Sequence, residues 1–167
     1  MNAAHYRRLI DYSYWAHRRV WDCLMQLSDE QFTRPADYSI GSLHAQVVHT
    51  LSSEDLWLRR LRNEAPTPAF ERTDAYPTRA AIRARWDEVE AEWRAFGAAL
   101  TDDQLEQTFT FRSITGDQIR TLRLHALVEV IAVVAVRPAV KAAALQRREV
   151  VRHEIAADLV PLVHHGP

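Results

Sequence analysis

The chain has 167 residues, 47% of them hydrophobic and 26% charged, which suits a single globular domain over residues 1–167. Its formal net charge of −1 gives no electrostatic reason to expect nucleic acid, because nucleic-acid binders usually carry a basic excess. The single cysteine, Cys23, excludes an intrachain disulfide and fits a reducing compartment. The longest apolar run, 126–136, is too short to span a bilayer, so we expect a cytoplasmic protein without membrane contact.

The N-terminal segment predicts an amphipathic helix, which ends near Leu27 and is followed by a turn at Ser28. Its inward positions recur at spacings of four and three residues, as in a helix that buries one face. They are Tyr6, Ile10, Ser13, His17, Val20, Leu24 and Leu27. Burying Ser13 or His17 unpaired would cost on the order of 1–3 kcal/mol. Either these two side chains hydrogen-bond to each other, or they line a cavity at the centre of the domain.

Two further helices are predicted, and each has a hydroxyl residue in the N-cap position. The second follows Ser42 and the third follows Thr78. The inward stripe of the second comprises Leu43, Val47, Thr50, Glu54, Trp57 and Leu61. The inward stripe of the third comprises Ile82, Trp86, Val89, Trp93, Phe96 and Leu100. At this spacing we interpret Trp86 and Trp93 as core residues. His49 is an inward-facing imidazole on the second helix.

The C-terminal third predicts a short β-hairpin and then more helix. Residues 108–112 alternate in polarity, and Thr115-Gly116-Asp117 would turn the chain back through 118–120. From about Thr121 the sequence is apolar nearly all round, which predicts the most buried helix. Pro138 either kinks this helix or begins another one. The apolar stripe of the tail comprises Val151, Ile155, Leu159 and Leu162. We expect this helical tail to pack against a second subunit in a homodimer.

These elements predict an all-α four-helix bundle with a short β-hairpin between helices three and four and a C-terminal helical tail. Several blocks, over roughly residues 4–127, resemble the DinB (YfiT-like) family of four-helix bundles. The first block is Tyr12-Ser13-Tyr14-Trp15-Ala16-His17, followed by Leu27-Ser28-Asp29-Glu30-Gln31-Phe32. The most specific block is Ser39-Ile40-Gly41-Ser42-Leu43 with His49, Glu54 and Trp57-Leu58. Gly116 followed by Leu122 also fits the family pattern.

The resemblance implies a divalent metal, usually zinc or nickel, held by three histidines. One histidine comes from the second helix, where His49 stands. The other two form a His-x-x-x-His pair on the fourth helix, ahead of an arginine. Aligning that arginine on Arg137 places the pair at Ala132 and Val136, which cannot coordinate a metal. Family members that act as thiol transferases or hydrolases use the metal to lower the pKa of a bound thiol or water. The resemblance therefore implies an incomplete metal site.

Two functional hypotheses follow. In the first, the chain is a metal-dependent thiol transferase or hydrolase with a pocket around His49, and Glu54 or His17 carries protons. His17, Glu54 and His125 are also candidates to replace the missing zinc ligands. In the second, the chain is a non-catalytic bundle that binds a small molecule at its centre or a protein partner. His49 would then be an inward histidine that is hydrogen-bonded within the bundle.

Overall fold

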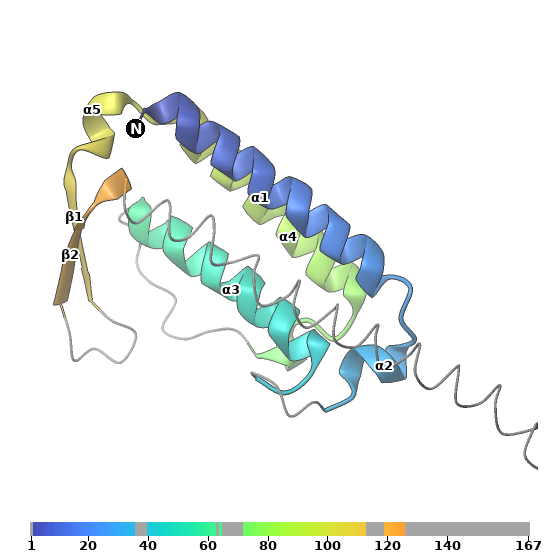
Figure 1. The fold of residues 1–167 in the computed structure, drawn as a ribbon. Helices are drawn as coiled ribbons and strands as arrows, with labels where there is room; N and C mark the ends of the chain where they lie inside the picture. The colour runs from blue at the N-terminus through green and yellow to red at the C-terminus, as the bar shows by residue number, and fades with distance from the viewer. Residues whose placement is uncertain (1, 36–39, 63, 65–71, 113–118, 126–167) are drawn as a thin grey trace, which may run out of the picture.

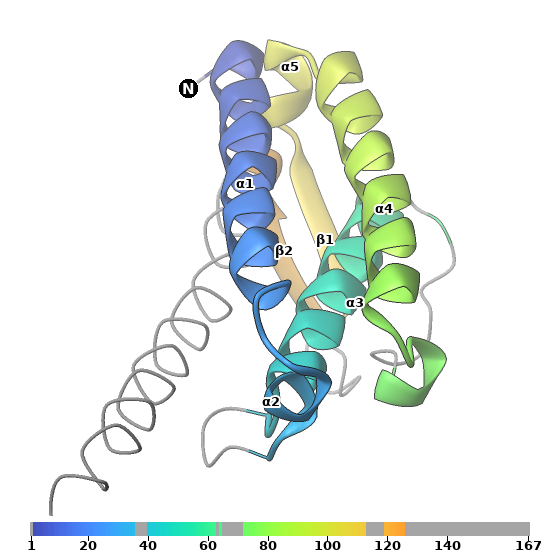
Figure 2. The same cartoon turned by 90° about the vertical axis from the view of Figure 1, so that its right-hand side faces the viewer.

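The structure is a computed structural model of the chain, and it describes residues 2–35, 40–62, 64, 72–112 and 119–125. Within these ranges three long helices lie alongside one another: α1 (Ala3–Leu24), α3 (Leu43–Leu61) and α4 (Arg79–Ala99) (Figure 1, Figure 2). The shorter elements are α2 (Asp29–Thr33), the 3-10 turn η1 (Thr73–Ala75) and α5 (Asp102–Leu105). The predicted turn after Leu27 thus contains a short helix. The predicted C-terminal helical tail lies outside the described residues.

The starts of α3 and α4 are the ones that the sequence predicts. The hydroxyl of Ser42 accepts a hydrogen bond from the backbone N–H of Ala45, at 3.0 Å. The hydroxyl of Thr78 accepts one from the N–H of Ala81, at 3.1 Å. Each cap satisfies a backbone donor that has no partner within the first helical turn. Both predicted N-caps are therefore confirmed.

The predicted inward stripes meet in the core between the three long helices. The best-buried hydrophobic members include Tyr6, Ile10, Val20 and Leu24 of α1, Leu43 and Val47 of α3, and Ile82, Trp86, Val89 and Trp93 of α4. Leu51 and Leu58 of α3, which the predicted stripe did not include, are also buried in this core. Trp86 and Trp93 are core residues, as predicted. Helices α1 and α4 approach closely at Gly97, where an added Cβ would lie 2.6 Å from Cδ1 of Ile10. The absence of a side chain at Gly97 therefore sets the spacing of these two helices.

Arg7 of α1 ties down the C-terminal end of α4. Its Nε donates to the carbonyl oxygen of Gly97 at 3.0 Å, and its Nη2 donates to that of Leu100 at 2.9 Å. The last carbonyls of a helix have no partner within the helix, so a guanidinium from a neighbouring helix stabilises them. This contact adds a polar link to the apolar packing of α1 on α4.

A two-stranded sheet lies at the end of the bundle where α5 and the N-terminus are found (Figure 1). Strand β1 (Thr108–Arg112) pairs antiparallel with β2 (Ile119–Arg123), and Thr110 is opposite Thr121. The two threonine hydroxyls are hydrogen-bonded across the strands at 2.8 Å. The connecting residues 113–118 lie outside the described part of the chain. On β1, Phe111 packs edge-on against Trp57 of α3.

The predicted start of the fourth helix is wrong by a few residues. We expected helix from about Thr121, but residues 121–123 belong to β2, and helical backbone begins at Leu124. The cross-strand pairing with β1 supplies hydrogen bonds that a sequence period cannot reveal. The rest of the predicted fourth helix lies outside the described residues. No helix in the described ranges is long and apolar enough to cross a membrane.

Candidate functional site

The centre of the bundle contains a buried group of polar and aromatic side chains, which we call the Glu54 network. Its members are Tyr14 and His17 of α1, Glu54 of α3 and Trp86 of α4. Tyr14 precedes His17 by three residues, so both project from the same side of α1. The exposed fraction is 3% for His17 and 4% for Glu54. A carboxyl group buried this completely requires hydrogen-bonding partners.

One oxygen of the Glu54 carboxyl group has two donors. Oε2 accepts hydrogen bonds from the Tyr14 hydroxyl at 3.3 Å and from Nε1 of Trp86 at 3.1 Å. In addition, Nε1 of Trp93 donates to the backbone carbonyl of Glu54 at 3.3 Å. Because the donors come from α1 and α4, Glu54 links all three long helices.

The other oxygen of Glu54 faces His17. Nε2 of His17 lies 3.2 Å from Oε1 of Glu54. The contact lacks hydrogen-bond geometry, and among the described residues Nδ1 and Nε2 of His17 and Oε1 of Glu54 have no hydrogen-bond partner. The imidazole ring packs edge-on to Tyr14 and lies 4.7 Å, centroid to centroid, from Trp86. The predicted hydrogen bond between Ser13 and His17 is therefore wrong. The alternative, a cavity, stays a prediction.

Burial drives both members of this pair towards their neutral forms. It raises the pKa of Glu54 to about 8, although the hydrogen bonds from Trp86 and Tyr14 act in the opposite direction. Burial also lowers the pKa of His17 to about 3, and the positive charges of Arg83 and Arg18 add to the effect. At neutral pH the pair is therefore a protonated carboxyl group beside an uncharged imidazole.

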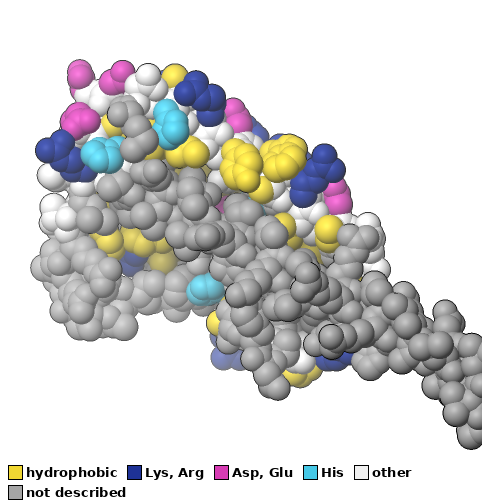
Figure 3. Space-filling model, in the orientation of Figure 1, with side chains coloured by type: hydrophobic (Ala, Val, Ile, Leu, Met, Phe, Trp, Pro, Cys, Tyr) yellow, Lys and Arg dark blue, Asp and Glu magenta, His cyan; other side chains and the backbone are white. Residues whose placement is uncertain are grey.

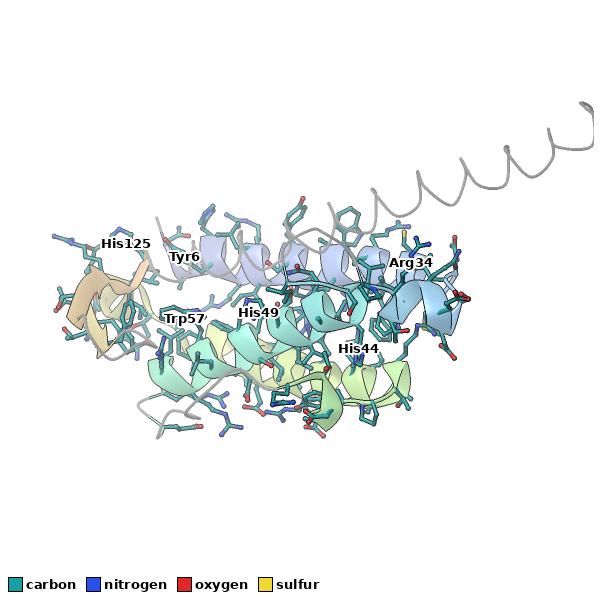
Figure 4. The ribbon with its side chains drawn as sticks, turned by 90° about the horizontal axis from the view of Figure 1, so that it is seen from below. Tyr6, Arg34, His44, His49, Trp57 and His125 are labelled. Carbon is teal, nitrogen blue, oxygen red and sulfur yellow. The ribbon has the colours of Figure 1, made fainter. Side chains whose placement is uncertain are left out.

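His49 lies on the same helix as Glu54, five residues before it. It lies near the middle of α3, between His44 and Trp57, whereas His125 lies at the end of the molecule that carries the strands (Figure 4). The His49 side chain is half-buried, and burial lowers its pKa, so the imidazole is neutral at neutral pH. A neutral imidazole is the form that binds metals.

The structure brings together only part of the proposed replacement ligand set. His17 and Glu54 are in contact, but the described residues contain no group of three or more His, Cys, Asp or Glu side chains suited to hold a metal. His49 and His125 therefore do not complete a site with that pair within the described ranges. A zinc centre needs three or four protein ligands, which this arrangement does not supply.

The partners of Glu54 are the residues that the sequence reasoning missed. The sequence patterns place Tyr14 only in a family block and Trp86 only among the core residues. A signal was present for Tyr14, because it lies four residues after Ile10 and three before His17, and so shares the inward face of α1. A buried carboxylate at Glu54 also demands donors from the neighbouring helices.

Three long helices around a buried polar centre, closed at one end by paired strands, define a helical-bundle protein. The family model described as the DinB family matches residues 1–132, and the chain therefore belongs to the DinB family. The comparisons with curated proteins and with solved structures found no match.

The donors present do not fit the three-histidine centre that the family implies. His49 occupies the second-helix position. The positions aligned with the histidine pair, Ala132 and Val136, carry aliphatic side chains by sequence and lie outside the described residues. No other cluster of three donors replaces them in the described ranges. One imidazole does not hold a divalent ion against water.

Proposed function

We propose that this DinB-family chain is a non-catalytic bundle that acts through protein interaction and has lost the metal centre of the family. The main support is the donor set: His49 is the only histidine at a family ligand position, and no three donors converge in the described residues. A second support is the exposure of large hydrophobic side chains, which favours contact with a partner. These side chains are Tyr12, Trp15, Met25 and Ile40.

The state of Glu54 also supports a structural role for the centre of the bundle. Its Oε2 accepts from two donors, and its Oε1 faces the uncharged imidazole of His17. Ligation or proton transfer by Glu54 would break contacts that connect α1, α3 and α4. Breaking a buried hydrogen bond costs on the order of 1–3 kcal/mol. The Glu54 network therefore acts best as a polar clamp between helices.

A second candidate is a metal-dependent thiol transferase or hydrolase with zinc or nickel at His49. Two observations favour it: His49 is a neutral imidazole, and the pKa of Glu54, about 8, suits proton transfer near neutral pH. The metal would supply a thiolate or hydroxide nucleophile by lowering the pKa of a bound thiol or water. This candidate needs two further ligands beyond those that the described residues bring together.

Elemental analysis separates the two candidates. The full chain is purified without chelator, and zinc and nickel are measured in the natural protein, in His49→Ala and in a control, His5→Ala, which changes a histidine of α1 outside the site. Under the proposal, no variant contains stoichiometric metal. A stoichiometric metal in the natural protein and in His5→Ala that is lost in His49→Ala would overturn the proposal and support the enzyme.

A further inference from the structure

The outward face of α1 carries two exposed aromatic rings. Tyr12 and Trp15 are stacked, with ring centroids 5.7 Å apart and an interplanar angle of 29°. Their exposed fractions are 61% and 50%. The guanidinium of Arg19 lies 5.5 Å from the Trp15 ring. Figure 3 shows hydrophobic side chains gathered over α1, with Lys or Arg side chains beside them. Stacked aromatic rings with a cationic rim are typical of the centre of an interface.

The charges on this face are arranged symmetrically about Trp15, with opposite signs. Arg8 and Asp22 each lie seven residues from Trp15, and Asp11 and Arg19 each lie four residues from it. Seven residues are about two helical turns and four are about one turn, so all four charges lie on the same side of α1 as Trp15. All four side chains are exposed.

We propose that this face of α1 packs against the same face of a second copy of the chain, with the two helices antiparallel and a two-fold axis beside Trp15. Such an axis places a residue before Trp15 at the level of the residue equally far after Trp15 in the other copy. Arg8 then faces Asp22 of the second copy, and Asp11 faces Arg19. Parallel helices would instead place like charges together. The proposal rests on the proposed function, because it names the protein partner.

Arg8 and Asp22 are available for an intermolecular contact. Neither Arg8 nor Asp22 forms an ion pair with another residue in the described ranges, whereas Asp11 already pairs with Arg94 of α4. The contact between Arg8 and Asp22 is therefore the main electrostatic determinant, and it occurs twice in a two-fold dimer. Burial of Tyr12 and Trp15 provides the apolar contribution. One helix face is a small interface, so the dimer depends on protein concentration.

The first test measures the mass of the full chain by sedimentation equilibrium between about 1 and 100 micromolar, a range that covers small interfaces. We expect a monomer–dimer equilibrium. Trp15→Ala should shift it to monomer over the whole range, with an unchanged circular dichroism spectrum because the side chain is exposed. Ile40→Ala is the matched control: Ile40 is also an exposed hydrophobic residue, but it precedes α3 and is not part of α1. It should leave the equilibrium unchanged.

The second test reverses the charges. Arg8→Asp and Asp22→Arg should each weaken the dimer at least tenfold, and the double variant should restore it. Arg72→Asp, the same change at an exposed residue beside η1, should have no effect. A monomer at every concentration would overturn the inference. A dimerisation constant that is unchanged in Trp15→Ala, or that stays weakened in the double variant, would overturn it as well. A metal-free monomer would contradict this inference but not the proposed function. Stoichiometric metal at His49 would contradict the proposed function, whether the protein is a monomer or a dimer.

Discussion

Nε2 of His17 lies 3.2 Å from Oε1 of Glu54, and both side chains are almost completely buried. A histidine and a glutamate at this distance on a protein surface would form an ion pair. Here burial raises the pKa of Glu54 and lowers that of His17, so the pair is uncharged. A neutral pair avoids the desolvation of two ions, which is often larger than the attraction between them. The centre of the bundle is therefore polar without being charged.

The first prediction concerns the pH dependence of the free energy of unfolding. Between about pH 6.5 and 8, Glu54 is protonated in the folded state but ionised in the unfolded chain, where its pKa is near 4.5. The folded state then holds one more proton, so this pair makes stability fall as pH rises, by about 1.4 kcal/mol per pH unit at most. Urea titrations of the natural protein and of Glu54→Gln, compared at each pH, isolate this contribution.

The same pair predicts the opposite slope at low pH. The pKa of His17 is about 3 when folded and near 6.5 when unfolded, so the unfolded chain binds one more proton at this residue between those values. Between about pH 3 and 4.5 this makes stability rise with pH, and from 4.5 to 6.5 the contributions of His17 and Glu54 cancel. Glu54→Gln removes the fall above pH 6.5 and leaves the rise due to His17. A variant profile parallel to that of the natural protein above pH 6.5 would contradict the raised pKa of Glu54.

The second prediction concerns the hydroxyl of Tyr14. Tyr14→Phe removes a buried donor to Oε2 of Glu54, so we expect a loss of about 1–2 kcal/mol in the free energy of unfolding at pH 6. Because that hydrogen bond lowers the pKa of Glu54, the variant should also extend the fall in stability to higher pH. Tyr12→Phe, which changes an exposed tyrosine of the same helix, is the control. Equal profiles for the two variants would argue against the hydrogen bond.

The third prediction concerns the close approach of α1 and α4. Gly97→Ala places a Cβ 2.6 Å from Cδ1 of Ile10, so the buried isoleucine must shift, at a cost of about 1–3 kcal/mol. Alanine also gains about 1 kcal/mol in helix propensity over glycine. In an Ile10→Val background, which lacks Cδ1, the same substitution should be neutral or stabilising. A double-mutant cycle measured by urea unfolding reports the coupling between residues 10 and 97. If the effects of the two substitutions on the free energy of unfolding simply add, the predicted clash is wrong.

The fourth prediction concerns the polar link between α1 and α4. Arg7→Lys keeps the positive charge but cannot reach the carbonyl oxygens of Gly97 and Leu100 with the same geometry. We expect a loss of about 1 kcal/mol in the free energy of unfolding, measured by urea titration. Arg72→Lys is the control, since Arg72 is an exposed arginine beside η1, outside the long helices. A loss of the same size in both variants would mean that the two hydrogen bonds of the Arg7 guanidinium do not contribute to the free energy of unfolding.

Local chemistry and periodicity predicted the helical elements well. The N-caps Ser42 and Thr78 depend on contacts with residues three positions away, which a sequence displays directly. The inward positions of His17 and Glu54 follow from a helical period, and both are buried. The predicted start of the fourth helix was wrong because residues 119–123 pair with β1, which lies 7 to 15 residues earlier in the chain. An apolar segment alone does not distinguish strand from buried helix.

The contacts between helices were not predictable in the same way. Periodicity places His17, Glu54 and Trp86 on inward faces, but it does not give the rotation and height of one helix relative to another. These are set by the packing of all the side chains between them, including the gap at Gly97. Charge behaviour follows from that packing, because burial determines the protonation of Glu54. The charge pattern around Trp15, by contrast, is visible in the sequence once the outward face of α1 is known.

The backbone N–H of Ala3, at the start of α1, donates to the carboxylate of Asp102 at 2.7 Å, across a separation of 99 residues. During synthesis the first turn of α1 therefore emerges long before the residue that completes it. A nascent chain that has not yet reached Asp102 lacks this acceptor, although the side chain of Asn2 can already cap the N–H of His5. Synthesis of the segment around α5 would then add the long-range link that holds the start of α1 in place.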